Sequence, residues 1–244
     1  MIFEVCVDTV AGALAAQAAG AQRIELCDNL VEGGTTPSLG MLQLARRLVT
    51  MEINVLIRPR GGDFCYSELE MEVMRLDILA AKSAGANGVV LGLLRPDGCV
   101  DEERTAELVA LARPMSVSFH RAFDLARDPH EALEAVCQLG IERILTSGQK
   151  PSALEGAACI ARLVEQAGKR VIILAGGGIN ETNIVELAAI TGVQEVHFAA
   201  RTALDSPMLF RNTICWMGKP YQPDEYTRKE TDPQRIRGII LAAS

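Results

Sequence analysis

The chain has 244 residues, of which 49% are hydrophobic and 4% aromatic, and its formal net charge is −7 at pH 7. This length suits one eight-fold α/β domain and is short for two domains, and the hydrophobic fraction is sufficient for a large aliphatic core. The acidic balance, with no cluster of Lys and Arg, excludes a typical nucleic-acid-binding surface. No apolar run is long enough for a membrane span, and the start MIFEVCVDTV lacks the features of a signal peptide.

Cysteine usage indicates the compartment. The chain has seven cysteines and no CxxC pair, so the spacing fits neither a disulfide framework nor a zinc finger. We therefore expect a cytoplasmic protein.

Eight short runs rich in β-branched and aliphatic residues recur along the chain and predict strands. They cover residues 2–7, 23–27, 53–58, 88–93, 115–120, 143–147, 171–175 and 195–199. The segments between them, such as MEVMRLDILAAKSAG, have apolar residues at three- and four-residue spacing and predict amphipathic helices.

Capping residues predict where several helices begin. Thr36 precedes Pro37, and Ser67, Asp128 and Ser152 each stand three residues before a glutamate. Eight strands alternating with helices predict an all-parallel sheet closed into a (β/α)₈ barrel. The alternative is an open, doubly wound sheet, but no G-x-G-x-x-G turn follows the first strand, which favours the barrel.

One segment departs from the repeat. From about residue 201 to 233 the chain shows no clear periodicity and contains several prolines. We expect it to be irregular and to cover the barrel mouth or contact a partner subunit. A final helix over about 234–243 then completes a single domain that spans residues 1–244.

The direction of side chains in the strands follows from their alternation. The set that faces the helices must be apolar, so Phe3 and Val5 point outward, and Glu4 and Cys6 point into the barrel. The same argument predicts further inward residues: Glu25, Cys27, Leu56, Arg58, Ser118, His120, Glu195 and His197. Charged groups in an interior are usually paired or functional. They form either an ion-pair plug that fixes the strand register or a functional site near the carboxyl ends of the strands.

The loops after the strands carry groups that suit an anion. Arg58-Pro59-Arg60-Gly61-Gly62-Asp63 combines two guanidinium groups with glycines that let a ligand approach the backbone. The alternative is a turn in which Asp63 pairs with one of the arginines. Glycines 176–178 follow the seventh strand, where such barrels often bind phosphate, although a tight turn is the alternative. The expected anion- or substrate-binding residues are Arg58, Arg60, Asp63, Arg121, Ser147, Gly176, Gly177, Gly178, His197 and Arg201.

Two further groups suggest chemistry. His120 is followed by Asp124, an arrangement that can serve acid–base catalysis. Cys6 and Cys27 face the interior from adjacent strands, so their backbones are expected about 5 Å apart. Two thiolates suit Cu(I), although most free cysteines are small buried residues. Zinc is disfavoured, because the sequence offers no obvious third and fourth ligand.

Several stretches resemble the CutC family of copper homeostasis proteins. They are EVCVDTVAGALAA, RIELCDNLVEGGTTPSLG, IRPRGGDFCYS, SFHRAFDLARDP, RILTSGQK and AGGGI, and the resemblance covers nearly the whole chain. It implies a TIM barrel, a cytoplasmic protein, a homodimer or higher homo-oligomer, and a role in copper tolerance or trafficking. It also implies a copper site at two interior cysteines, whose motif positions match Cys6 and Cys27.

Three functional hypotheses remain open. The first is a copper-binding homeostasis protein. The second is an enzyme for a small anionic or phosphorylated substrate, with Glu4 or Glu25 as base and His120 as acid, oriented by Asp124. The third is a non-catalytic oligomeric scaffold. The residues themselves favour the second, because a soft-metal site needs neither two arginines nor three glutamates, and arginines near Cu(I) raise its electrostatic cost.

Overall fold

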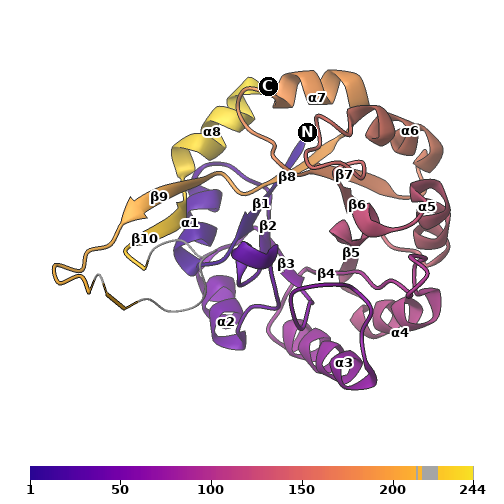
Figure 1. Cartoon of the computed structure of the whole chain (residues 1–244), viewed down its shortest axis with the longest axis horizontal. Coiled ribbons are helices and arrows are strands. Elements are labelled where there is room, and N and C mark those ends of the chain that lie inside the picture. The colour runs from indigo at the N-terminus through magenta and orange to yellow at the C-terminus, as the bar shows by residue number, and fades with distance from the viewer. Residues whose placement is uncertain (213, 216–224, 244) are drawn as a thin grey trace.

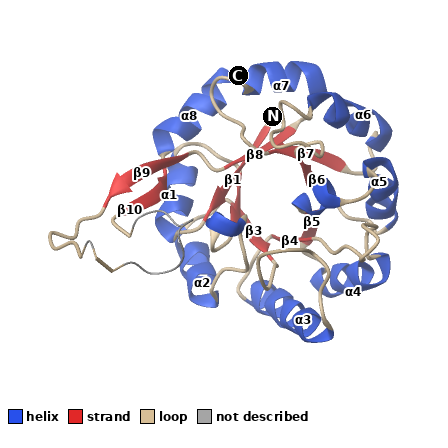
Figure 2. Cartoon of the chain, in the orientation of Figure 1, coloured by secondary structure: helices blue, strands red, loops and turns tan. Residues whose placement is uncertain are grey.

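Eight parallel strands form a closed barrel in the computed structural model, and helices surround it (Figures 1 and 2). The structure describes residues 1–212, 214, 215 and 225–243. The strands are β1 Ile2–Val7, β2 Arg23–Leu26, β3 Glu52–Leu56, β4 Gly88–Leu91, β5 Ser116–Phe119, β6 Arg143–Thr146, β7 Ile172–Gly176 and β8 Glu195–Phe198. Each strand pairs with the next along the chain, and β8 pairs with β1. The predicted (β/α)₈ barrel is therefore confirmed.

The helices follow the strands in chain order. They are α1 Val10–Ala18, α2 Leu39–Leu48, α3 Glu68–Ser83, α4 Glu102–Ala112, α5 Pro129–Gln138, α6 Ala157–Ala167, α7 Ile184–Thr191 and α8 Pro233–Ala242, with short 3₁₀ helices η1 Leu30–Glu32 and η2 Arg121–Leu125. Within the described ranges, none of the helices has both the length and the apolar character needed to cross a membrane.

An aliphatic layer between the strands and the helices holds the barrel together. Val5 of β1 and Ile24 of β2 are completely buried, as are Met71, Met74 and Ile78 on one face of α3. Each such side chain contributes about 1.5–3 kcal/mol by leaving water. The alternate positions point into the barrel, as the sequence predicts, and they include apolar residues such as Leu56 and Val90, which pack with Cys6 and Cys27.

Two of the predicted helix starts are confirmed. Ser67 and Glu70 form a reciprocal capping box at the start of α3, and the side chain of Asp128 caps α5. The predicted starts at Thr36 and Ser152 are wrong, because α2 and α6 begin further along the chain.

The segment expected to be irregular contains a pair of strands. β9 Arg201–Asp205 and β10 Thr227–Thr231 form an antiparallel hairpin that projects from the side of the barrel (Figure 1), where β10 contacts α1. Residues 213 and 216–224 of this segment lie outside the described residues. The strands escape detection because their polar sequence lacks the apolar alternation of the barrel strands.

Candidate functional site

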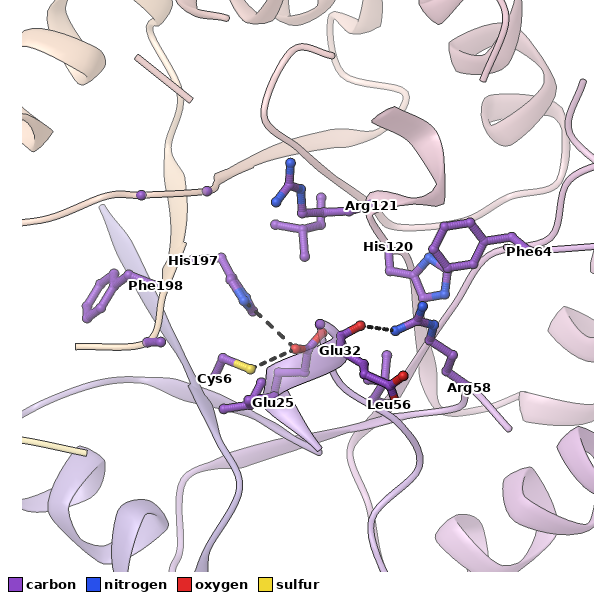
Figure 3. Close-up of a pocket in the computed structure, with 16 residues that line it drawn as sticks. Cys6, Glu25, Glu32, Leu56, Arg58, Phe64, His120, Arg121, His197 and Phe198 are labelled. Atoms are coloured by element: carbon purple, nitrogen blue, oxygen red, sulfur yellow. Dashed lines mark hydrogen bonds and ion pairs between the residues drawn. The ribbon is translucent and has the colours of Figure 1, made fainter. Parts of the chain in front are cut away.

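A pocket of about 320 Å³ opens at the carboxyl ends of the barrel strands (Figure 3). This volume suits a small organic ligand. Half of the predicted site residues line it: Cys6, Glu25, Arg58, His120, Arg121, Gly177, Gly178 and His197. The other predicted site residues lie below the pocket or outside it.

Buried ion pairs lie beneath the pocket. Arg23, with 2% of its surface exposed, forms ion pairs with Glu4 and Glu195. Arg143 adds a second cation, with its Nε 2.9 Å from the carboxylate of Glu195. The structure thus contains the interior ion-pair plug as well as a pocket. Arg23 is absent from the sequence prediction, although its alternation with Glu25 on β2 could have identified it.

Glu4 links this plug to the pocket. Its carboxylate accepts hydrogen bonds from Asn54 and Arg23, and lies 2.8 Å from Nδ1 of His197. Burial alone would raise the pKa of Glu4, but His197 and Arg23 together lower that pKa to about 2. Glu4 is therefore an ionised anchor for His197, and its low pKa makes it a weak base.

Cys6, Glu25 and His197 line one side of the pocket, and Cys27 contacts Cys6 without lining it; these four residues are here called the thiol side. The register of β1 and β2 pairs Cys6 with Glu25, and Cys27 directly follows β2. The two sulfur atoms lie 3.4 Å apart, and the Cys6 sulfur is 3.2 Å from Oε2 of Glu25. Nε2 of His197 approaches the same oxygen at 3.8 Å. These polar groups therefore satisfy one another.

The surroundings of the thiol side raise the pKa of Cys6, Glu25 and His197. A hydrogen bond with Cys27, burial and the charge of Glu25 raise the pKa of Cys6 well above its usual value. Burial raises the pKa of Glu25. Burial lowers the pKa of His197, but the charges of Glu25 and Glu4 outweigh burial and raise it. Glu25 and His197 can thus exchange a proton with a ligand. Cys6, Glu25 and Cys27 also place three potential metal-ligand atoms within 4.8 Å of one another.

The opposite side, here called the arginine side, consists of Arg58, Phe64 and His120 (Figure 3). The Phe64 ring lies 5.0 Å from the guanidinium carbon of Arg58 and 4.9 Å from the His120 ring. The terminal nitrogens of Arg58 donate at 2.7–3.0 Å to the backbone carbonyls of Glu32, Gly34 and Gly62. Uncharged groups, and not carboxylates, therefore hold the guanidinium in place.

His120 is neutral. Its Nδ1 accepts a hydrogen bond of 3.1 Å from the backbone N–H of Ala122. Burial and the nearby charge of Arg58 lower the pKa of His120 to about 3. The ring therefore carries one proton near pH 7 and can act as a neutral hydrogen-bond donor, while its role as a general acid stays a prediction.

Asp124 does not reach His120. Its carboxylate accepts hydrogen bonds from the backbone and the hydroxyl of Ser147 and forms an ion pair of 2.7 Å with Arg121. Thr146 and Gln149 also donate to it. The loop after β6 thus has hydrogen-bond donors that suit an anion, but the carboxylate of Asp124 already accepts from them. The backbone N–H and the hydroxyl of Ser147 both bond to Asp124.

Four other predicted residues, Arg60, Asp63, Gly176 and Arg201, also lie away from the pocket lining. Arg60 bonds with Asp63 and Glu70, so the alternative of a self-paired turn is the observed one. Arg201 forms an ion pair with Asp8. Gly176 lies behind His197, where a Cβ atom would be 2.5 Å from Leu145, so glycine provides room for close packing.

Sequence reasoning missed several residues of the pocket wall. Glu32 and Gly33 come from the η1 region after β2, and Leu145 and Phe198 come from strand ends. Phe64 lies within the Arg58 loop, but its role depends on the loop turning back over the barrel. Of these positions, only Leu145 could have been found by strand alternation, because it lies two residues after the inward Arg143 on β6.

Comparison with known proteins decides the family. A family model described as the CutC family matches residues 1–202. The chain belongs to the CutC family. It is 49% identical over 242 residues to proteins named copper homeostasis protein cutC homolog in human and mouse, covering 99% of this chain and 89% of each relative. It is 51% identical to a CutC protein of Chromobacterium violaceum, covering 98% and 96% of the two chains.

Solved structures agree with this CutC assignment. A CutC protein from Streptococcus agalactiae superposes with a TM-score of 0.78 at 34% identity, covering 81% of this chain and 98% of that one. Phosphoribosylanthranilate isomerase from Thermotoga maritima superposes with a TM-score of 0.60 at 14% identity, covering 100% and 98%. The second likeness shows the barrel fold alone.

Proposed function

We propose that this CutC protein takes part in copper homeostasis by binding Cu(I) at Cys6 and Cys27. The observation that carries the proposal is the 3.4 Å separation of the two buried sulfur atoms at the edge of the pocket. Soft sulfur ligands favour Cu(I) over harder cations. The names of the human and mouse relatives support a link to copper.

The donor chemistry around the thiols fits a cation that is taken up and released. Because the pKa of Cys6 is raised, its thiol is protonated without metal, and binding must release that proton. Glu25 accepts the Cys6 hydrogen bond and can take up the released proton. Copper affinity should therefore depend on pH.

The test is competition with a Cu(I)-specific chelator under reducing conditions. Replacing Cys6 and Cys27 together with serine should abolish stoichiometric binding, because both soft ligands are lost. The matched control is Cys137→Ser with Cys159→Ser, which changes two partly buried cysteines elsewhere in the fold. Unchanged binding after loss of Cys6 and Cys27 contradicts this site.

A second candidate function is acid–base catalysis on a small anionic or phosphorylated substrate. Glu25 supports it, because this buried carboxyl lines the pocket, has a raised pKa and lies beside His197. Such a group can hold and transfer a proton near neutral pH. Arg58, Gly177 and Gly178 line the same pocket, and they supply the uncompensated positive charge and the close backbone approach that an anion needs, whereas the charge of Arg121 is already paired with Asp124.

This candidate is tested by a thermal-shift screen with organic acids and sugar phosphates. A ligand that binds the native state raises Tm as its concentration increases. Any turnover of that ligand should fall by at least about 100-fold in Glu25→Gln, which cannot transfer the proton. Absence of any stabilising anion in the screen argues against this function.

We also propose that the protein is a cytoplasmic homo-oligomer. The seven free cysteines support a reducing compartment. The β9–β10 hairpin supports self-association, because the chain beyond β9 exposes Leu209, Phe210 and Ile214 almost fully. Light scattering should show a lower mass for Leu209→Ser with Phe210→Ser, whereas an unchanged mass places the interface elsewhere.

A further inference from the structure

Two nitrogen atoms on the arginine side have no hydrogen-bond partner among the described residues. They are Nε of Arg58 and Nε2 of His120. Both side chains line the pocket, and they are only 6% and 4% exposed. Buried polar atoms are rarely unsatisfied, so two such atoms in one pocket wall indicate a missing ligand.

The charge of Arg58 is also uncompensated. Its hydrogen bonds go to backbone carbonyls, and no carboxylate within the described ranges forms an ion pair with it. By contrast, Arg121 pairs with Asp124, and Arg60 in the same loop as Arg58 pairs with Asp63. A buried guanidinium without a counter-charge is costly, and an anionic ligand would remove that cost.

The tautomer of His120 fixes what its free nitrogen can do. Because Nδ1 accepts the hydrogen bond from Ala122, that nitrogen carries no proton. The single proton of the neutral ring is therefore on Nε2. His120 and Arg58 thus both present an N–H group, and both need an acceptor.

The number and shape of these donors favour a carboxylate. Two N–H groups on planar side chains match the two oxygens of a planar carboxylate, whereas phosphate sites usually add several backbone amides. The amide of Ser147 in the loop after β6 is already bonded to Asp124. We propose that Arg58 and His120 form a subsite for the carboxylate group of a small organic ligand.

This subsite rests on the second candidate function, since it names the substrate class of the anionic pocket. Both nitrogen atoms are covered in this structure, so a ligand oxygen reaches them only after a side chain moves. Phe64 lies against both groups and is only partly buried, which makes it the side chain in position to move. Glu25 and His197 face the ligand from the other side of the pocket.

The test measures binding of succinate, the neutral analogue succinamide and inorganic phosphate by calorimetry. Succinate should bind the wild type more tightly than the other two. Arg58→Met should weaken succinate binding by about 10- to 100-fold, because a charge-assisted hydrogen bond and the counter-charge are lost. Arg60→Met is the matched control, because that arginine stands in the same loop but outside the pocket lining, and it should bind succinate as the wild type does.

Two substitutions separate the nitrogens of His120. Asparagine can keep the acceptor for Ala122 but lacks the outer donor, so His120→Asn should lose succinate affinity. Glutamine can extend an N–H to the position of Nε2, so His120→Gln should retain more of it. In ¹⁵N spectra of the wild type, His120 should be protonated on Nε2, and this signal should shift with succinate.

The outcomes distinguish the subsite from the wider proposal. If anions bind but Arg58→Met and His120→Asn bind them equally well, the subsite is wrong and the anionic pocket remains. Preference for phosphate over succinate overturns the carboxylate assignment. A proton on Nδ1 of His120 overturns the donor pair. If neither succinate nor phosphate binds the wild type, the subsite is wrong, and the screen of organic acids and sugar phosphates then decides whether the anionic-substrate function fails as well.

Discussion

The thiol side and the arginine side of the pocket differ in how their polar atoms are satisfied. On the thiol side, Cys6, Glu25, Cys27 and His197 contact one another, and Glu4 anchors His197 to the buried ion pairs. On the arginine side, backbone carbonyls hold Arg58 in place, and the N–H groups at Nε of Arg58 and Nε2 of His120 have no partner among the described residues. The polar groups of the thiol side therefore bond to one another, whereas the N–H groups of the arginine side lack a hydrogen-bond acceptor.

The two proposals therefore assign different kinds of ligand to the two sides of one pocket. A metal cation that binds at the thiol side must displace the proton of Cys6, whose pKa is raised. An anion at the arginine side displaces nothing charged, because it completes a set of donors that are already oriented. Copper binding and anion binding are therefore separable, and substitutions on one side should test each without removing the other.

The largest expected effect on stability comes from replacing Glu4, the carboxylate that holds His197 of the thiol side in place. Glu4→Gln removes a buried carboxylate from Arg23 and His197, and should lower the free energy of unfolding by about 3–5 kcal/mol. The measurement is urea unfolding followed by circular dichroism. Arg58→Met should cost less, about 1–3 kcal/mol, because it leaves carbonyls unsatisfied but leaves no partner charge unpaired.

A surface carboxylate provides the control for Glu4. Glu52 also approaches Arg23, at 4.0 Å, but 60% of its side chain is exposed. Glu52→Gln should therefore change the free energy of unfolding by less than about 1 kcal/mol. Similar losses in Glu4→Gln and Glu52→Gln would show that the buried pairs do not support the thiol side.

Strand alternation predicted the barrel and much of the pocket. The apolar outward positions of β1, β2, β5 and β8 were sufficient to direct Glu4, Cys6, Glu25, His120 and His197 inward. The proximity of Cys6 and Cys27 followed from the same rule, because parallel neighbours share their inward positions. These predictions depend only on periodicity and on the burial of apolar surface.

The roles of individual charged groups could not be predicted in this way. Arg58 and Arg60 are two residues apart in one motif, yet one is buried without a carboxylate and the other pairs with Asp63 and Glu70. Asp124 stands near His120 in sequence but turns toward Ser147. Loop conformation decides these contacts, and residue type alone does not specify it.

An effect of intermediate size is expected in the titration of the two buried histidines, His120 and His197. In an NMR titration, His197 should titrate above its usual pKa of 6.5, because Glu25 and Glu4 outweigh burial, whereas His120 should stay neutral down to a pKa of about 3. His197 therefore stabilises the fold below pH 6.5, and this contribution is lost as pH rises through its raised pKa. The contribution of His120 to the pH dependence of stability has the opposite sign. Because its pKa is lowered in the folded state, the free energy of unfolding falls as pH decreases from 6.5 toward 3.

The variant Glu4→Gln provides the check on this titration. It removes one of the carboxylates that raise the pKa of His197, so that pKa should fall, while the pKa of His120 should not change. Movement of both histidines together contradicts the separation of the two sides.

The smallest expected effect is that of Arg58 on copper. Two protonated thiols that bind one Cu(I) as thiolates change the charge of the site from neutral to −1, so a distant guanidinium favours the complex. Arg58→Met should therefore weaken Cu(I) binding at fixed pH, by less than about tenfold, because Arg58 faces the thiols from across the pocket (Figure 3). This sign corrects the simpler expectation that arginines near copper only raise its electrostatic cost. Chelator competition at several pH values checks it: an unchanged affinity in Arg58→Met would show that only one proton leaves the site, tighter binding would show that none leaves, and a larger loss would show that the two sides act as one site.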